Sequence, residues 1–235
     1  MLGKTMKRFY KQAGAAPVGA EFAVQLDGRS IKTPAGRKLE VPSQSLAQAI
    51  AAEWDAQSEE IKPHTMPLTQ LASTALDRVG PERAAITEQM IAYAGTDLLC
   101  YRAQSPSDLV DLQTKTWQPL LDWAQTHLGA GLTVTTGLIA IEQPPQALAA
   151  LRARLEAYDL WRLTVAQAAC AAAGSLILAL ALAEGRLSGE ECFAASNLDE
   201  AYQVALWGDD AEAADRRALL SRDIESAARM LVLLD

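Results

Sequence analysis

The longest uncharged stretch of the chain, residues 163–183, limits the possible folds more than any other feature. Its 21 residues are enough for a helix to cross a bilayer. Nine of them are alanine and Gln167 lies among them, a composition that suits close packing against other helices. The stretch therefore predicts a helix enclosed by other helices. A transmembrane span is the alternative.

Residues 7–42 have the pattern of a small antiparallel sheet. Apolar residues alternate with polar or small ones over 22–26, and Asp27-Gly28 is the dipeptide of a tight hairpin turn. Leu39 and Val41 indicate a further short strand after the turn at Pro34-Ala35-Gly36.

After Pro42 the spacing of the apolar residues changes from the two-residue period of a strand to the period of a helix. Ser43 is placed to cap a helix in which Leu46, Ile50 and Trp54 follow one another at four-residue spacing. We expect Trp54 to anchor this helix on the sheet. Prolines at both ends of 63–67 exclude regular helix there, so we predict a sheet-plus-helix domain over 1–62 and a mainly helical domain over 63–235.

The second domain is predicted to be a helical bundle, which makes the fold class α+β. Ser188 with Glu191 has the spacing of a capping box. Two short apolar runs, 98–101 and 138–141, interrupt the pattern and are candidate strands that would extend the amino-terminal sheet. The expected helices span 68–79, 81–94, 106–128, 145–158, 162–184, 188–206 and 210–233.

The charge balance argues against nucleic-acid binding. The net charge is -8 with a pI near 4.9, and four basic residues near the amino end are the only candidate for a phosphate-binding stripe. No apolar segment of a secretory signal follows them, so we expect no export. Cys100, Cys170 and Cys192 form no CxxC pair and are expected to be buried thiols in a reducing compartment.

Motifs of cofactor or metal chemistry are not apparent. The segment 14–19 has the glycine spacing of a phosphate loop, but Ala20-Glu21 stands where Lys-Ser/Thr is required, so we interpret it as a loop of small residues. His64 and His127 are the only histidines, and we expect no metal, cofactor or catalytic residue. The alternative is a small-molecule enzyme that uses His64 with nearby carboxylates in a cleft.

The segment 197–208 carries an unusual helix face. Glu200, Gln203 and Trp207 fall at i, i+3 and i+7, and Gly208 is placed to end the helix. A carboxylate, an amide and a tryptophan on one face are typical of a protein contact with an aromatic anchor. A surface helix with one buried tryptophan is the alternative.

Several sequence blocks follow one another in a characteristic order over essentially the whole chain. The blocks are Lys7-Arg8-Phe9-Tyr10-Lys11, Leu26-Asp27-Gly28-Arg29 through Thr33-Pro34, Glu53-Trp54-Asp55-Ala56-Gln57, Met66-Pro67-Leu68-Thr69, Asp77-Arg78-Val79 and Tyr202-Gln203-Val204-Ala205-Leu206-Trp207-Gly208. Taken in this order they resemble the family of F-type ATP synthase assembly chaperones that bind the free alpha subunit, in its alpha-proteobacterial form. The resemblance implies the bacterial cytoplasm as the compartment, for which the mitochondrial matrix is the equivalent.

This resemblance implies a chaperone, not an enzyme, that holds the unassembled alpha subunit until the beta subunit replaces it. It implies no cofactor. Separately, we expect no stable membrane insertion; the sequence leaves the oligomeric state open, and a monomer is the expectation. The functionally sensitive acid of the family best matches Glu200, with Glu212 as the second candidate. Mitochondrial members carry a histidine soon after Trp-Gly, where this chain has Ala213-Ala214-Asp215. Trp54, Gln203, Trp207 and Gly208 complete the expected contact or site-support residues.

Overall fold

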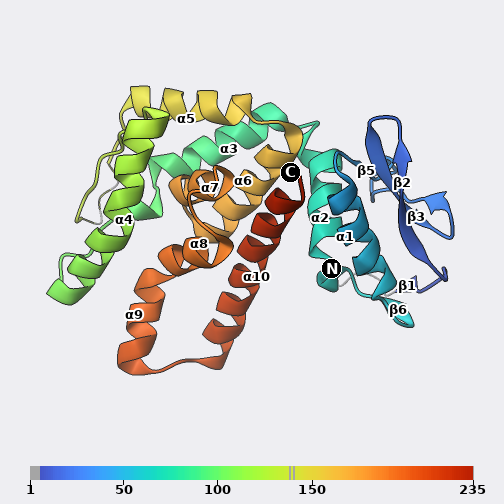
Figure 1. Cartoon of the computed structure of the whole chain (residues 1–235). Helices are drawn as coiled ribbons and strands as arrows, with labels where there is room; N and C mark the ends of the chain where they lie inside the picture. Colours follow the sequence, from blue (N-terminus) through green and yellow to red (C-terminus); the bar gives the residue numbers. More distant parts are fainter. Residues whose placement is uncertain (1–5, 138, 140, 235) are drawn as a thin grey trace. The chain divides into compact units, whose positions relative to one another are not determined.

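The computed structural model describes residues 6–137, 139 and 141–234, and within them the chain forms two compact units. The N-terminal unit consists of residues up to Arg83 together with the end of the last helix from Arg229, and the helical unit runs from Ala84 to Ala228. Every strand of the described residues lies before residue 62, and helices follow (Figure 1). The α+β class expected from the sequence is confirmed.

Antiparallel strands form one layer of the N-terminal unit. Strand β3 (Glu21–Leu26) pairs with β2 (Ala13–Val18), β4 (Arg29–Ser30) and β5 (Glu40–Val41). Separately, β1 (Met6–Lys7) pairs with β6 (Glu60–Ile61). The predicted hairpin turn is present, with positive φ of 48° at Asp27 and 77° at Gly28. The segment 14–19 is not the loop we expected, because its small residues run in β2 along β3.

Helix α1 (Gln44–Asp55) covers this layer, packing on β2, β3 and β5 (Figure 1). Its cap is the predicted one, since the Ser43 hydroxyl accepts the Leu46 N–H at 3.1 Å. Leu46 and Ile50 are fully buried. Trp54, one helical turn further on, is half-buried against a cluster of Tyr10, Leu26, Ile61 and Met66. The helix therefore holds its tryptophan at the rim of the core.

A second helical layer follows α1 in the N-terminal unit. The short helix η1 (Pro63–Thr65) leads into α2 (Pro67–Thr74), which continues as the π-helix η2 (Ala75–Val79). The Glu53 carboxylate of α1 accepts the N–H groups of Leu68 and Thr69, both at 2.8 Å, and so caps α2. α1 and α2 also pack on one another, and the N-terminal unit extends to Arg83, past the boundary we expected at 62/63.

The helical unit contains the long uncharged stretch as two helices in place of one. Helix α6 (Leu160–Ala173) ends at Gly174, whose φ of 66° is left-handed, and Ser175 caps α7 (Leu176–Ala183). All eight residues of α7 are buried, as expected of an enclosed segment. Within the described part of the chain, no helix combines the length and the hydropathy of a membrane span.

Of the remaining helices, α8 packs on both α6 and α7. Helices α8 and α9 replace the single helix expected over 188–206 because the chain breaks at Asn197, and the capping box of Ser188 and Glu191 is present. α4 and α8 pack on α7, and α5 and α9 pack on α4. The bounds are α3 (Arg83–Gly95), α4 (Ser107–Leu128), α5 (Pro145–Ala157), α8 (Gly189–Ser196), α9 (Leu198–Trp207) and α10 (Ala211–Leu234).

The expected strand at 98–101 is wrong. Residues Leu98–Cys100 form the short helix η3, capped by the buried Asp97, and Tyr101 makes only an isolated bridge to Thr135. Of the second candidate strand, residues 138 and 140 lie outside the described residues. The cysteines are buried free thiols, as expected.

Candidate protein-contact site

Helix α9 is the most exposed of the helices that the sequence singled out. Leu198 is its one buried residue. α9 leads to the connection at 208–210, from which α10 returns, so that the two form a hairpin (Figure 1). We refer to residues 198–217 as the α9–α10 hairpin.

The hairpin encloses a hollow of about 500 Å³, and the predicted face of α9 lines it. Glu200, Gln203 and Trp207 all border this space, together with Gly208. Gly208 ends the helix with a φ of 86°, and its N–H donates to the Val204 carbonyl at 2.9 Å. Glu212 is exposed in the first turn of α10 and is not among the lining residues. Trp54 belongs to the N-terminal unit.

Trp207 is 78% exposed and Leu206 beside it is 56% exposed. The alternative of a surface helix with one buried tryptophan is therefore wrong. Leu206 therefore does not anchor α9 in the fold either. An aromatic side chain held on an ordered helix but left in solvent is typical of the residues that dominate protein contacts.

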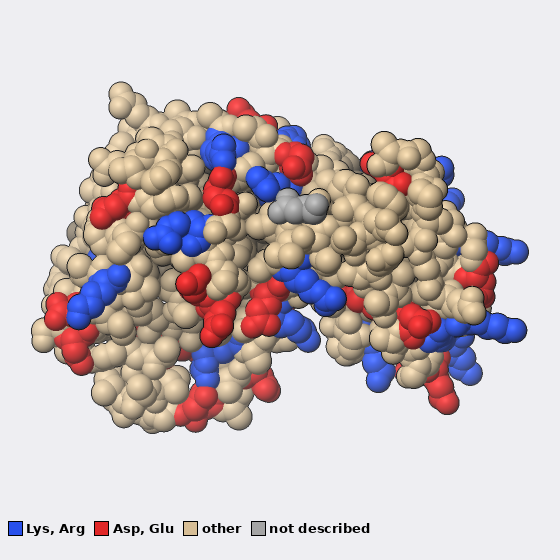
Figure 2. Space-filling model, viewed as in Figure 1, with Lys and Arg blue, Asp and Glu red and all other residues tan. Residues whose placement is uncertain are grey.

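The Glu200 carboxylate is not left to water alone, because two arginines of α10 bind it. It accepts hydrogen bonds from Arg217 at 3.0 Å and from Arg216 at 3.2 Å, both on α10. Arg217 also pairs with Asp209, and these two carboxylates raise the pKa of Arg217. Acidic and basic side chains are likewise interspersed on the face of the helical unit drawn in Figure 2. The hollow is thus bordered by an ion-pair network rather than by a single charge.

Sequence analysis missed both arginines. Arg216-Arg217 is the only pair of adjacent arginines in the chain, a signal that was available. Their partner on α9 could not be read from spacing, because the hairpin geometry sets which residues of α9 and α10 meet. The pairing of Glu200 with Arg216 and Arg217 is a product of the tertiary structure.

A further set of contacts missed by the sequence fixes the base of α9 on α4. The buried Gln113 amide donates to Asp199 at 2.7 Å, and the Tyr202 hydroxyl donates to Asp108 at 2.8 Å. Next to them the Trp117 indole donates to the Ala195 carbonyl of α8 at 2.8 Å. One end of α9 is therefore fixed while Trp207 at the other end is exposed.

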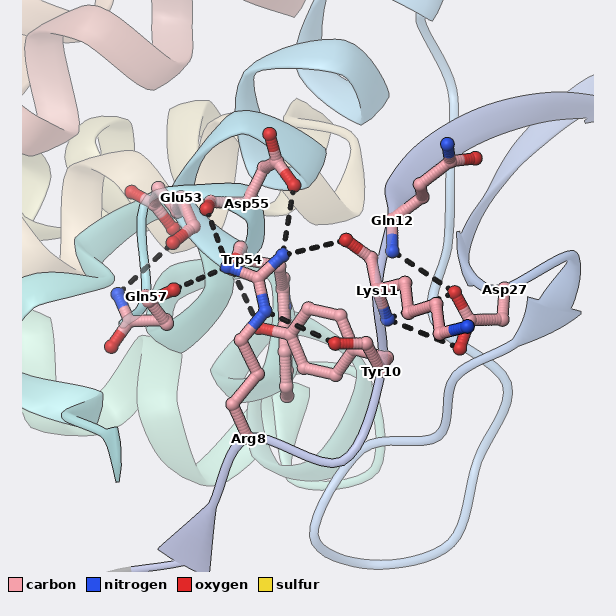
Figure 3. A network of polar contacts seen from close by, with 9 residues as sticks. All are labelled: Arg8, Tyr10, Lys11, Gln12, Asp27, Glu53, Trp54, Asp55 and Gln57. Carbon is pink, nitrogen blue, oxygen red and sulfur yellow. Dashed lines mark hydrogen bonds and ion pairs between the residues drawn. The ribbon is translucent and has the colours of Figure 1, made fainter. Parts of the chain in front are cut away.

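The amino-terminal family blocks serve a different purpose, which Figure 3 shows at Arg8. Its guanidinium donates to the carbonyls of Asp55 at 2.8 Å, Lys11 at 2.9 Å and Tyr10 at 3.1 Å, and also to that of Gln57. It pairs with the Asp55 carboxylate at 3.1 Å and lies over the Tyr10 ring. Arg8 thereby satisfies carbonyls at the end of α1, which is a structural task.

Trp54 is part of the same arrangement. The Tyr10 hydroxyl donates to the Trp54 carbonyl at 2.6 Å, and the two rings meet edge to face at 5.8 Å. Trp54 also borders a pocket of about 580 Å³ that is lined by residues 31–34, by Ile61 of β6 and by one face of α2. Its indole nitrogen is buried without a hydrogen-bond partner. The position supports the core of the N-terminal unit.

The enzyme alternative finds no support at His64. This side chain is exposed on η1, and the neighbouring pocket is lined by Pro63 and not by His64. Burial raises the pKa of Asp97 to about 6, but this carboxylate belongs to the helical unit and caps two helices there. In the described ranges, no group of three or more His, Cys, Asp or Glu residues could hold a metal ion.

Comparison with known proteins decides the family. The family model described as "ATP12 chaperone protein" matches residues 7–125. The mitochondrial protein atp12 of Schizosaccharomyces pombe is 30% identical over 237 residues, which cover 95% of this chain and 81% of the relative. The chain belongs to the ATP12 chaperone family. The assignment confirms the resemblance found in the sequence blocks.

Solved structures of similar proteins agree with this assignment. Atp12 from Paracoccus denitrificans has a TM-score of 0.91 and 39% identity, covering 97% of this chain and 98% of its own. The Atu1473 protein of Agrobacterium tumefaciens has a TM-score of 0.92 and 40% identity, covering 98% and 87%. ATP12 chaperones are non-enzymatic assembly factors of the F1 ATP synthase, with relatives in bacteria and in fungal mitochondria.

Proposed function

We propose that this ATP12 chaperone binds the unassembled alpha subunit of the F1 sector and prevents its aggregation until the beta subunit replaces it. An alpha subunit made ahead of its partners exposes the surface that later contacts beta, and large exposed apolar surfaces aggregate. A chaperone without an ATP-driven cycle acts by binding and mass action, so a partner with higher affinity displaces it.

The observation that carries this proposal is the exposed Trp207 on a charged helix face. We assign Trp207 the role of apolar anchor and Gln203 that of a directional hydrogen-bonding group next to it. Gly208 supports both by ending α9 so that Trp207 stays in solvent. Glu212 remains a candidate for a peripheral charged contact.

Glu200 can exchange its partners in this proposal. In the free chain Arg216 and Arg217 balance the negative charge of Glu200. Keeping this carboxylate at the surface therefore costs little free energy. A client arginine could replace Arg216, which is largely exposed, while Arg217 keeps its bond to Asp209. Such an exchange would give specificity with little change in net charge, and it would remain reversible.

Trp54 is assigned a supporting role, through the rigidity of the N-terminal unit. For the compartment we propose the bacterial cytoplasm, because three buried free thiols suit a reducing environment. We further propose that the chaperone acts as a monomer that holds one client chain.

The direct test is a dilution experiment with purified alpha subunit. Light scattering should fall when the chaperone is present at equal concentration, and adding the beta subunit should release the chaperone. Trp207→Ala should reduce the protection at least about tenfold, whereas Tyr93→Ala, which removes another exposed aromatic of the helical unit, should not. If the unaltered chaperone leaves the scattering unchanged, the proposed function is wrong.

A further inference from the structure

The second side of α9 borders a separate groove of about 690 Å³, a volume in the range of ligand pockets. Its walls are α4 on one side and α8 with α9 on the other, and residues 186–187 close one part of it. The lining is mainly apolar, with Leu112, Pro119 and Leu187 among its side chains. α9 therefore lies between two hollows of different character.

The lining residues recur at helical spacing on both walls. On α4 they include Leu112, Thr116 and Pro119, and on α9 they include Leu198, Ala201 and Ala205. Each set covers about two turns, or roughly 11 Å of helix. Ala201 and Ala205 are exposed, so small side chains leave the α9 wall open.

Hydrogen bonds between the walls hold the groove in shape. The buried Gln113 amide donates to Asp199 of α9, and the buried Trp117 indole donates to the carbonyl of Ala195, which lines the groove. A preformed groove loses less conformational entropy on binding than one that has to be ordered.

The charges at the groove are mainly basic, in a protein whose net charge is -8. Lys115 and Arg186 are exposed among the lining residues. The one carboxylate there, Glu191, already accepts the Ser188 N–H at 2.8 Å in the capping box. Charge complementarity therefore favours an acidic occupant.

We propose that this groove binds an amphipathic helix of the client subunit, with an apolar stripe at i, i+3 or i+4, and i+7 and acidic residues beside it. The walls are helices whose backbone groups bond within themselves, so an extended peptide would find no backbone partners. A helix brings its own hydrogen bonds, and two turns of wall match the stripe. This inference rests on the proposed function.

The test uses the full chain with purified alpha subunit and a photo-reactive benzophenone residue at position 205. Irradiation should link it to one segment of the alpha subunit, and mass spectrometry should show an apolar stripe flanked by Asp or Glu. The same group at the exposed Ala149 of α5 is the control and should give no link. Links to a second copy of the chaperone, or to a basic or extended segment, overturn the proposal.

Substitution provides the second arm. Ala205→Glu should weaken capture of the alpha subunit at least about tenfold at an unchanged melting temperature, and Ala149→Glu should not. Lys115→Glu with Arg186→Glu should weaken capture similarly and remove part of its salt dependence. If the unaltered chaperone captures the alpha subunit and the Ala205→Glu variant captures it equally well, the groove proposal is wrong and the proposed function is unaffected. If the unaltered chaperone fails to capture the alpha subunit, both proposals fall.

Discussion

The two ends of the chain use their family blocks in opposite ways. In the N-terminal unit, Arg8 and Glu53 direct nearly all their polar groups at the backbone of neighbouring elements. In the α9–α10 hairpin, Trp207 and Gln203 are left in solvent, and the charged side chains beside them pair with one another across the hairpin. The difference separates residues that build the fold from residues available to a partner. Substitutions at each end of the chain test this difference.

The largest effect on stability is expected from Trp54→Arg. The substitution puts a charge against the cluster of Tyr10, Leu26, Ile61 and Met66 and removes the edge contact with Tyr10. We expect the free energy of unfolding to fall by about 3–4 kcal/mol. Ala52→Arg, on the exposed face of the same helix, is the matched control in chemical denaturation. A loss below about 1 kcal/mol would mean that Trp54 is not part of the core.

A pH effect of similar size is expected at Asp97. Burial raises the pKa of this carboxyl to about 6 from 3.8, so the folded chain binds its proton more tightly than the unfolded chain. Its contribution to stability is therefore complete below pH 4 and is lost as the pH rises through about 6. Two pKa units correspond to about 3 kcal/mol.

Denaturation of the unaltered chain and of Asp97→Asn over this pH range isolates the effect. As the pH rises, the free energy of unfolding of the unaltered chain should fall relative to that of the Asp97→Asn variant. A difference independent of pH would show that the carboxyl is not buried as the structure has it.

Arg8→Ala tests the hydrogen bonds that Arg8 donates around the end of α1. It leaves the carbonyls of Asp55 and Gln57 at the end of α1, and that of Lys11, without their charged donor, so we expect a loss of about 2–3 kcal/mol. Lys7→Ala, at an exposed neighbour, should change little. Thermal unfolding of both variants is sufficient, and equal melting temperatures would contradict the structural role.

The smallest effect on stability is expected at Glu200. Because Arg216 and Arg217 surround it, Glu200→Lys should cost about 1 kcal/mol rather than nothing, and it should weaken capture of the alpha subunit about tenfold. Adding Arg216→Glu restores an opposite charge within the hairpin. The double variant should recover the melting temperature but not the capture. Recovery of both would make Glu200 a structural residue only.

Local pattern predicted much of this fold. Alternation and the Asp27-Gly28 turn gave the hairpin, the Ser43 cap and four-residue spacing gave α1, and the uncharged stretch gave the buried centre of the helical unit. Strand β2 was not predicted as a strand, because its small side chains carry little strand propensity. The break between α6 and α7 at Gly174 was not predicted, because Asp97, which is distant in sequence, stabilises the cap of α7 at Ser175.

The candidate site was predictable only as a helix face. Spacing placed Glu200, Gln203 and Trp207 on one side of α9, and Gly208 at its end. Whether Trp207 is exposed depends on which elements pack around α9, and the composition of α9 does not reveal those neighbours. The ion pairs of Glu200 and the second groove likewise require the positions of α10 and α4.

Hydrogen–deuterium exchange with and without the alpha subunit tests the central claim, that the open hairpin is where the client binds. The account predicts slower exchange over residues 199–217 in the complex, with the backbone around Arg8 and Gln57 unchanged. Equal exchange in the hairpin, with new protection confined to the N-terminal unit, would contradict it.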